Sequence, residues 1–165
     1  TSQGLDITYD PALRQSFLAA LKSDADGWPL FQACCGKPLA LTGFEVIELS
    51  ESRSSSSASR KSEEAKALRA ALPEGIVVAL DERGKSIVSE ALANQIGRWR
   101  DDGRPAASFV IGGADGLEPA FVAGADLVLS FSPLTWPHQL VRIMLAEQLY
   151  RTTTILAGHP YHRGD

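Results

Sequence analysis

The chain of 165 residues is poor in cysteine, in long apolar runs and in positive charge. Its two cysteines, Cys34 and Cys35, are neighbours, and neighbouring cysteines bridge only with strain and connect no distant segments. We therefore expect free thiols in a reducing cytoplasm. No apolar stretch approaches the roughly 20 residues that cross a bilayer, and no signal peptide is evident. These absences predict a cytoplasmic protein that does not enter a membrane.

The charge balance and the glycine pattern exclude further classes. The chain has 16 Lys and Arg against 20 Asp and Glu, a net charge of −4, which argues against a protein that coats nucleic acid through bulk positive charge. An RNA enzyme with a few cations at one site remains open. The glycines of residues 112–116 match neither the P-loop nor the dinucleotide fingerprint. Because no carboxylate cluster suits magnesium either, we predict no metal site.

From Pro73 onward, short apolar runs alternate with amphipathic stretches. Apolar runs typical of strands buried on both faces lie at residues 76–80, 108–111 and 127–131. Helical periodicity is found at residues 86–99, 118–123 and 137–152. Residues 81–85 are predicted to form a turn, and residues 153–156 are a candidate last strand. The alternation predicts an α/β fold, a mostly parallel sheet flanked by helices.

The first half has weaker patterns. A strand over residues 5–9 and a helix beginning at Asp10-Pro11 and continuing through residue 21 are predicted there. Residues 44–49 alternate and favour a strand. Residues 50–62 contain eight serines beside three cations, which fits either a flexible solvated loop or a loop that orders on RNA; a helix follows over residues 63–72. We expect one domain spanning residues 1–165.

Three segments with unusual content follow the predicted strands, at residues 80–85, 111–116 and 130–138. Because ligands bind outside the carboxyl ends of parallel strands, these segments predict one shared pocket. The glycines of the second segment suit either a structural turn or a cofactor loop. In the third, Pro133 and Pro137 bracket Leu134, Thr135 and Trp136, a stiff apolar surface suited to an adenine or a methionine chain.

The predicted helix over residues 137–152 is apolar almost all round, so it must be covered on more than one side. One side can meet the sheet and the other a second subunit. Arg142 lies among its aliphatic residues and needs a carboxylate or a phosphate as a partner. Beyond it, residues 159–163 hold two of the three histidines with Tyr161 and Arg163. Such a tail can stack on a base, bind phosphates or move a proton, or it is simply a solvated end.

Five motifs occur together in a fixed order. They are LDERGK (80–85), WRDDGR (99–104), IGGADGL (111–117), LSFSPLTWPHQLVRIMLAEQLYR (129–151) and HPYHR (159–163). With them the sequence resembles the ribosomal large-subunit methyltransferase H family, within the SPOUT (α/β-knot) class. The resemblance covers roughly residue 37 to the end, and residues 1–36 differ from the usual opening of the family.

The resemblance implies an α/β fold with a deep trefoil knot at its carboxyl end, S-adenosylmethionine bound in the knot, and a homodimer assembled around it. It also implies methylation of N3 of a pseudouridine in a hairpin loop of 23S rRNA, on the assembled ribosome. Carried over by position, the cofactor contacts are Leu80, Gly112, Phe131, Ser132, Pro133, Leu134, Thr135 and Trp136.

The chemistry requires alignment and removal of a proton. An imide nitrogen attacks well only after its proton has left, so the protein must align donor and acceptor and assist deprotonation or stabilise the anion. We assign proton handling to His162, stabilisation of a phosphate or base anion to Arg142, and orientation to Tyr161; bulk water is the alternative base. Two other functions remain open, a non-catalytic RNA- or ribosome-binding homologue and an α/β nucleotide hydrolase.

Overall fold

The computed structural model describes residues 30–35 and 44–158. Its elements follow along the chain as β1 (Leu30–Cys35), β2 (Phe44–Leu49), α2 (Ser57–Ala71), β3 (Ile76–Lys85), α3 (Ser89–Asp101), β4 (Ala107–Ile111), α4 (Pro119–Ala123), β5 (Leu127–Leu129) and α5 (His138–Leu156). Within these residues, no helix is long and apolar enough to span a membrane. The strand and helix predicted over residues 5–21 lie outside the described residues.

The strands form one five-stranded sheet in the order β2-β1-β4-β3-β5. Strand β3 lies between β4 and β5 and pairs in parallel with both, so the predicted parallel α/β arrangement is confirmed for these three strands. Strand β1 pairs antiparallel with β2 on one side and with β4 on the other. The strand predicted at residues 44–49 is β2, whereas no pattern predicted β1.

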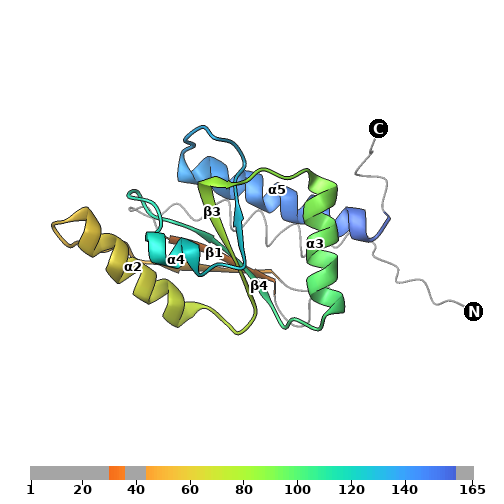
Figure 1. The fold of residues 1–165 in the computed structure, drawn as a ribbon, viewed down its shortest axis with the longest axis horizontal. Helices are drawn as coiled ribbons and strands as arrows, with labels where there is room; N and C mark the ends of the chain where they lie inside the picture. Colours follow the sequence, from red (N-terminus) through yellow and green to blue (C-terminus); the bar gives the residue numbers. More distant parts are fainter. Residues whose placement is uncertain (1–29, 36–43, 159–165) are drawn as a thin grey trace, which may run out of the picture.

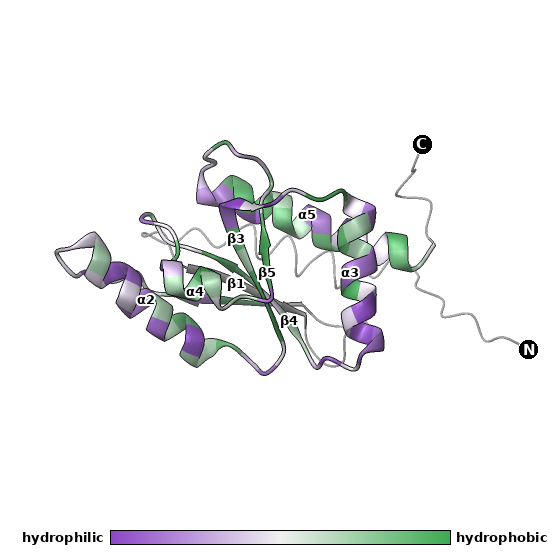
Figure 2. Ribbon diagram, in the orientation of Figure 1, coloured by the Kyte–Doolittle hydropathy of each residue, from purple (hydrophilic) through white to green (hydrophobic). Residues whose placement is uncertain are grey.

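Helices cover both faces of the sheet (Figure 1), α3 and α5 on one side and α2 and α4 on the other. Phe109 in β4 packs in the core with α3 and α5, and its neighbour Val110 packs in the core with α2 and α4. Adjacent residues of a strand point to opposite faces. Both faces are therefore apolar, which explains the green of β5 and of the first part of β3 in Figure 2 and the continuous apolar runs of the sequence.

Two predicted boundaries are wrong. Helix α2 begins at Ser57, so residues 57–62 are not part of a serine-rich loop. The hydroxyl of Ser56 accepts a hydrogen bond from the Ser59 backbone at 3.0 Å and caps the helix. Helix α5 continues to Leu156, where a last strand was expected. The hydroxyls of Thr153 and Thr154 donate to carbonyl oxygens three residues earlier, so these β-branched residues stay helical.

The predicted turn over residues 81–85 is instead an irregularity within β3. Leu80 and Lys85 both pair with Leu129 of β5, so the residues between them leave the ladder. Gly84 allows this close return of the chain, because a Cβ there would lie 2.7 Å from the backbone carbon of Leu129 and from the carbonyl oxygen of Val128. The side chains of residues 81–83 are thereby placed beyond the regular end of the strand.

Gly84→Ala should therefore destabilise the fold by about 1–3 kcal/mol, the usual cost of inserting a methyl group into closely packed surroundings. Urea denaturation measures this loss. Gly124→Ala is the matched control, because its added Cβ would lie 3.5 Å from its nearest neighbour, an ordinary contact. Equal stability of Gly84→Ala and the unmodified chain would contradict the constraint placed on Gly84.

Candidate functional site

The sheet topology opens a crevice at the carboxyl ends of the parallel strands. The chain leaves β3 toward α3, on one face of the sheet, and leaves the adjacent strand β4 toward α4, on the other face. Where neighbouring parallel strands send their connections to opposite faces, a ligand site lies between them. The segment that follows β5 closes the same edge before α5 begins.

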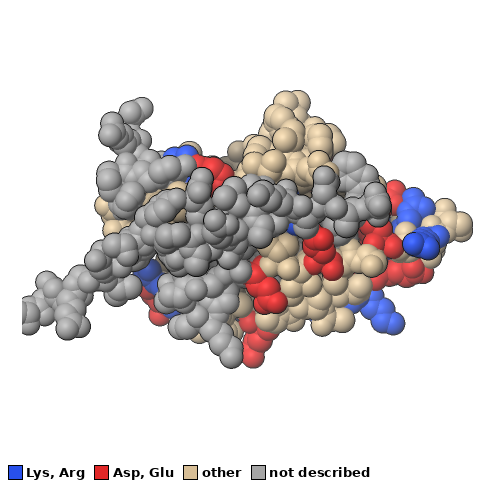
Figure 3. Space-filling model, turned by 180° about the vertical axis from the view of Figure 1, so that it is seen from behind, with Lys and Arg blue, Asp and Glu red and all other residues tan. Residues whose placement is uncertain are grey.

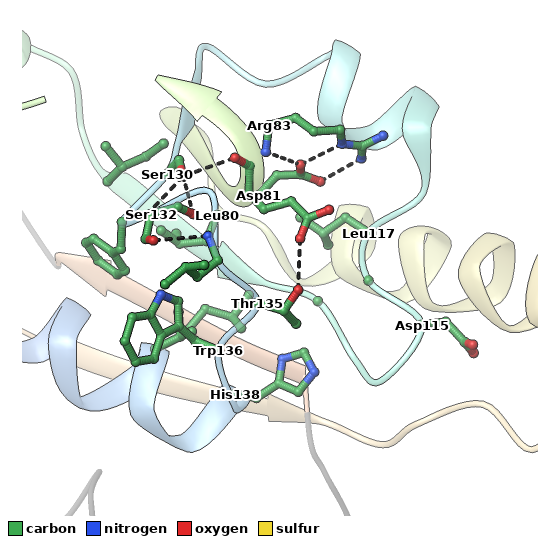
Figure 4. A pocket seen from close by; sticks show the side chains of 18 of the residues that line it. Leu80, Asp81, Arg83, Asp115, Leu117, Ser130, Ser132, Thr135, Trp136 and His138 are labelled. Atoms are coloured by element: carbon green, nitrogen blue, oxygen red, sulfur yellow. Dashed lines mark hydrogen bonds and ion pairs between the residues drawn. The ribbon is translucent and has the colours of Figure 1, made fainter. Parts of the chain in front are cut away.

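A pocket of about 430 Å³ occupies this edge (Figure 4), within the usual size range of small-molecule sites. It brings together all three segments that the sequence singled out. Seven of the eight predicted cofactor residues line it: Leu80, Gly112, Phe131, Ser132, Leu134, Thr135 and Trp136. Pro133, the eighth, is exposed and does not line the pocket.

Hydrogen bonds join the segment after β5 to the irregularity of β3. The Ser130 hydroxyl lies 3.1 Å from the carbonyl oxygen of Glu82 and 2.9 Å from that of Ser132. The Thr135 hydroxyl lies 3.2 Å from a carboxylate oxygen of Glu82. Within the segment, the Leu134 backbone N–H donates to the Ser132 hydroxyl at 3.0 Å. This side of the pocket is therefore held in shape by polar contacts.

The glycine segment after β4 folds back on itself and forms the opposite side of the pocket. The Gly116 N–H donates to the Gly113 carbonyl at 2.8 Å, and Gly116 has a φ of +78°, which favours glycine. A Cβ on Gly112 would lie 2.8 Å from the backbone nitrogen of Leu117. The segment is therefore a turn that requires glycine, and it also lines the pocket; its role as a cofactor loop stays a prediction.

Charges of both signs line the pocket. Arg83 binds the Asp81 carboxylate with two guanidinium nitrogens, at 2.8 and 2.7 Å, and these hydrogen bonds hold the pKa of Asp81 below its ordinary value. Asp115 and Glu82 add carboxylates, and Lys61 of α2 adds a cation. Together with the apolar side chains of Leu80 and Trp136, this lining suits a ligand that has both an apolar part and charges of both signs.

His138, the first residue of α5, also lines the pocket and is half-buried. Burial lowers the pKa of its imidazole from the ordinary value of 6.5, because desolvation disfavours the charged form. At neutral pH the neutral imidazole is therefore the main form at this edge of the pocket.

Of the three predicted catalytic residues, the structure describes only Arg142. Arg142 lies on α5, where its Nη2 is 2.5 Å from a carboxylate oxygen of Glu48 in β2, and it is not part of the pocket lining. The carboxylate partner expected for this arginine is thus present. Tyr161 and His162 lie outside the described residues. Among the described residues, no group of three or more His, Cys, Asp or Glu could hold a metal ion.

The prediction from sequence missed several lining residues. Lys61 lies at the start of α2, in a segment expected to be loop, and Val141 belongs to a helix considered mainly for its apolar surface. Asp81, Asp115 and His138 lay within the chosen segments without a role. Their position directly after a strand was the only available signal, and it does not say which way a side chain points.

The fold and the pocket first define a class, the α/β proteins with a pocket at the carboxyl edge of parallel strands, where such proteins have their ligand sites. A family model described as a predicted SPOUT methyltransferase matches residues 29–162. Three similar proteins each have the name ribosomal RNA large subunit methyltransferase H. That of Allorhizobium ampelinum is 58% identical over 132 residues, 79% of this chain and 82% of that protein. Those of a Bradyrhizobium species and of Rhodopseudomonas palustris are each 57% identical over 129 residues, 78% of this chain and 81% of each protein. The chain belongs to this methyltransferase H family of SPOUT methyltransferases.

The lowered pKa of His138 predicts a pH dependence. Below pH 6.5 the unfolded chain binds a proton at this imidazole that the folded chain does not, so the free energy of unfolding should decrease as the pH falls below 6.5. Urea denaturation at several pH values should show a smaller decrease for His138→Gln. In the folded protein, the His138 ring resonance should titrate below 6.5 in nuclear magnetic resonance spectra. A midpoint above 6.5 would contradict the assigned effect of burial.

Proposed function

We propose that this chain transfers a methyl group from S-adenosylmethionine to N3 of a pseudouridine in a hairpin loop of 23S rRNA, on the assembled large subunit. The observation that carries the proposal is the convergence of three family-matched segments, at residues 80–83, 112–117 and 130–136, on one pocket. The names of the similar proteins support a large-subunit RNA substrate. Because its substrate would be part of the ribosome, the protein would act in the cytoplasm.

The lining of the pocket fits S-adenosylmethionine chemically. Apolar side chains such as Leu80, Leu117 and Trp136 suit the adenine and the methionine chain. Asp81 and Glu82 complement the positive sulfonium and amino groups, and Lys61 complements the carboxylate. When bound, the cofactor supplies an activated methyl group. The task of the protein is to hold the two reactants in alignment.

We propose that the trefoil knot of the family encloses this pocket. Ser130, in the segment after β5, donates a hydrogen bond to the irregular part of β3. Helix α5 begins directly after this segment. The knot and the pocket would then be built from the same residues.

We also propose a homodimer formed through α5. Leu140 and Ile143 of α5 are 44% and 46% exposed, and their spacing of three residues puts them on one stripe of the helix. Trp136, just before the helix, is 39% exposed. Leu145 and Leu149 of the same helix are buried against the sheet. An apolar stripe opposite the buried side suits a second copy of the helix.

Local cations have to compensate for the acidic character of the chain. On the face shown in Figure 3, the Lys and Arg side chains of the described residues gather at the end where α2 lies, with Asp and Glu beside them. A broad basic surface is not visible there. We propose that the ribosome presents the base and that Arg142, Tyr161 and His162 contact it. A guanidinium has five N–H donors, so the ion pair of Arg142 with Glu48 is compatible with a second acceptor.

The function predicts that the purified protein transfers tritium from labelled S-adenosylmethionine to ribosomes from a strain that lacks the endogenous enzyme. The label should map to N3 of one pseudouridine of 23S rRNA. Binding to those ribosomes without any transfer would instead favour a non-catalytic RNA- or ribosome-binding homologue. Two observations motivate this alternative: the first residues of the chain do not match the family model, and the net charge is negative.

Arg142→Ala and deletion of residues 161–165 should each reduce methyl transfer at least about 100-fold, the usual effect of losing a group that stabilises developing charge. The affinity for S-adenosylmethionine, measured by calorimetry, should stay within about threefold, because Arg142 does not line the pocket.

Glu48→Gln is the matched control, since it breaks the same ion pair and keeps the guanidinium. It should retain most of the activity. If Glu48→Gln loses as much activity as Arg142→Ala, Arg142 acts only by fastening α5 to β2, and the proposed contact with RNA is excluded.

A further inference from the structure

Arg60 joins two segments that lie far apart in the sequence. In α2, its Nε lies 2.6 Å from Oδ2 of Asp115, and its Nη2 lies 3.2 Å from Oδ1 of the same carboxylate. The third nitrogen, Nη1, donates to the backbone carbonyls of Ser54 and Ser55, at 3.0 and 3.3 Å. One guanidinium thus connects the serine-rich segment before α2, residues 50–56, to the glycine segment of the pocket, residues 112–117.

The serine-rich segment is itself held against α2. The Ser52 backbone N–H donates to a carboxylate oxygen of the buried Glu64 at 3.1 Å. The hydroxyls of Ser52 and Ser54 donate to Glu63 at 2.5 and 2.7 Å. These contacts fix the two carbonyls that orient the Arg60 guanidinium, so Arg60 reaches Asp115 from a preorganised position.

The pair differs from an ordinary surface ion pair in geometry and setting. Isolated exposed pairs contribute little, whereas two parallel hydrogen bonds within a network contribute more. The side chains of Arg60 and Asp115 are 30% and 25% exposed. Hydrogen bonds from Arg60, with a further one from Ser57, lower the pKa of Asp115. The carboxylate therefore stays ionised and bound to Arg60 at neutral pH.

The surroundings of Asp115 make its position near α2 depend largely on Arg60. Burial raises the pKa of the nearby Glu51, and the negative charges of Glu64 and Asp115 raise it further. Three carboxylates therefore crowd this corner, and Arg60 neutralises the one that belongs to the glycine segment. Without Arg60, the hydrogen bond from Ser57 and the charge of Lys61 would be left to hold Asp115 near α2, so its segment would be held less firmly.

Asp115 belongs to the turn in which Gly112 packs against the backbone of Gly116 and Leu117. In Figure 4 its side chain points away from Thr135 and His138, the labelled side chains across the pocket. A movement of Asp115 would displace the backbone of the turn, and with it one side of the pocket, although Arg60 itself does not line the pocket.

We propose that Arg60 is a positioning residue for cofactor binding, which holds the glycine segment of residues 112–117 in its binding conformation through Asp115. The serine-rich segment thereby acts as the support of the cofactor site. This inference rests on the proposed function, since S-adenosylmethionine is taken as the ligand.

Calorimetric titration of the full chain with S-adenosylmethionine tests the proposal. Arg60→Gln and Asp115→Asn should each raise the dissociation constant about tenfold, and the double variant should be no weaker than either single variant, because both remove one interaction. Arg69→Ala is the matched control. It breaks another ion pair of α2, with Glu118 of the α4 cap at 3.3 Å, and should leave the dissociation constant within about twofold.

A second measurement separates positioning from general destabilisation. Hydrogen exchange of the ligand-free protein should accelerate at residues 112–117 in Arg60→Gln and in Asp115→Asn, and should stay unchanged there in Arg69→Ala. If Arg60→Gln does not fold, Asp115→Asn still provides both readouts.

The possible outcomes distinguish the two proposals. Unchanged affinity and exchange in the Arg60 and Asp115 variants, or an equal loss in Arg69→Ala, would overturn the role of Arg60. If the unmodified chain does not bind S-adenosylmethionine, the proposed function fails instead. The exchange comparison would then still decide whether Arg60 holds the glycine segment.

Discussion

Parallel pairing of β3 with both β4 and β5 is the constraint on which the pocket depends. It puts the carboxyl ends of three strands at one edge, although the strands are separated in the sequence by α3 and α4. Apolar packing on both faces stabilises this order, through side chains such as Phe109 and Val110 that point in opposite directions. The burial of apolar side chains thus stabilises the strand order, while the polar loops at the strand ends contribute little to the core.

At that edge, local contacts order segments rich in glycine and serine and give the pocket its shape. Gly84 lets β3 return against β5 after the residues that leave the ladder, and Gly112 lets the next segment fold onto Leu117. Ser130 connects the first and third segments, and Arg60 connects the second to α2. A small-molecule site that binds tightly needs such preorganisation, because ordering a loop on binding reduces affinity.

Much of this was predictable from sequence. Continuous apolar runs identified β3, β4 and β5, and the strand-end rule selected segments that do line one pocket. The antiparallel strand β1 was missed because residues 30–35 have no distinctive pattern. The early start of α2 was missed because serine favours both loops and helix caps. Contacts such as Arg142 with Glu48 join residues 94 apart, and local periodicity contains no information about them.

Hydrogen exchange of the full chain, measured with and without saturating S-adenosylmethionine, tests most directly whether the three strand-end segments form one cofactor site. We predict slower exchange on binding at residues 80–85, 112–117 and 130–138 together, with the amino ends of β3, β4 and β5 unchanged. Saturation of binding without protection of these segments, or with protection confined to another part of the chain, would contradict this prediction.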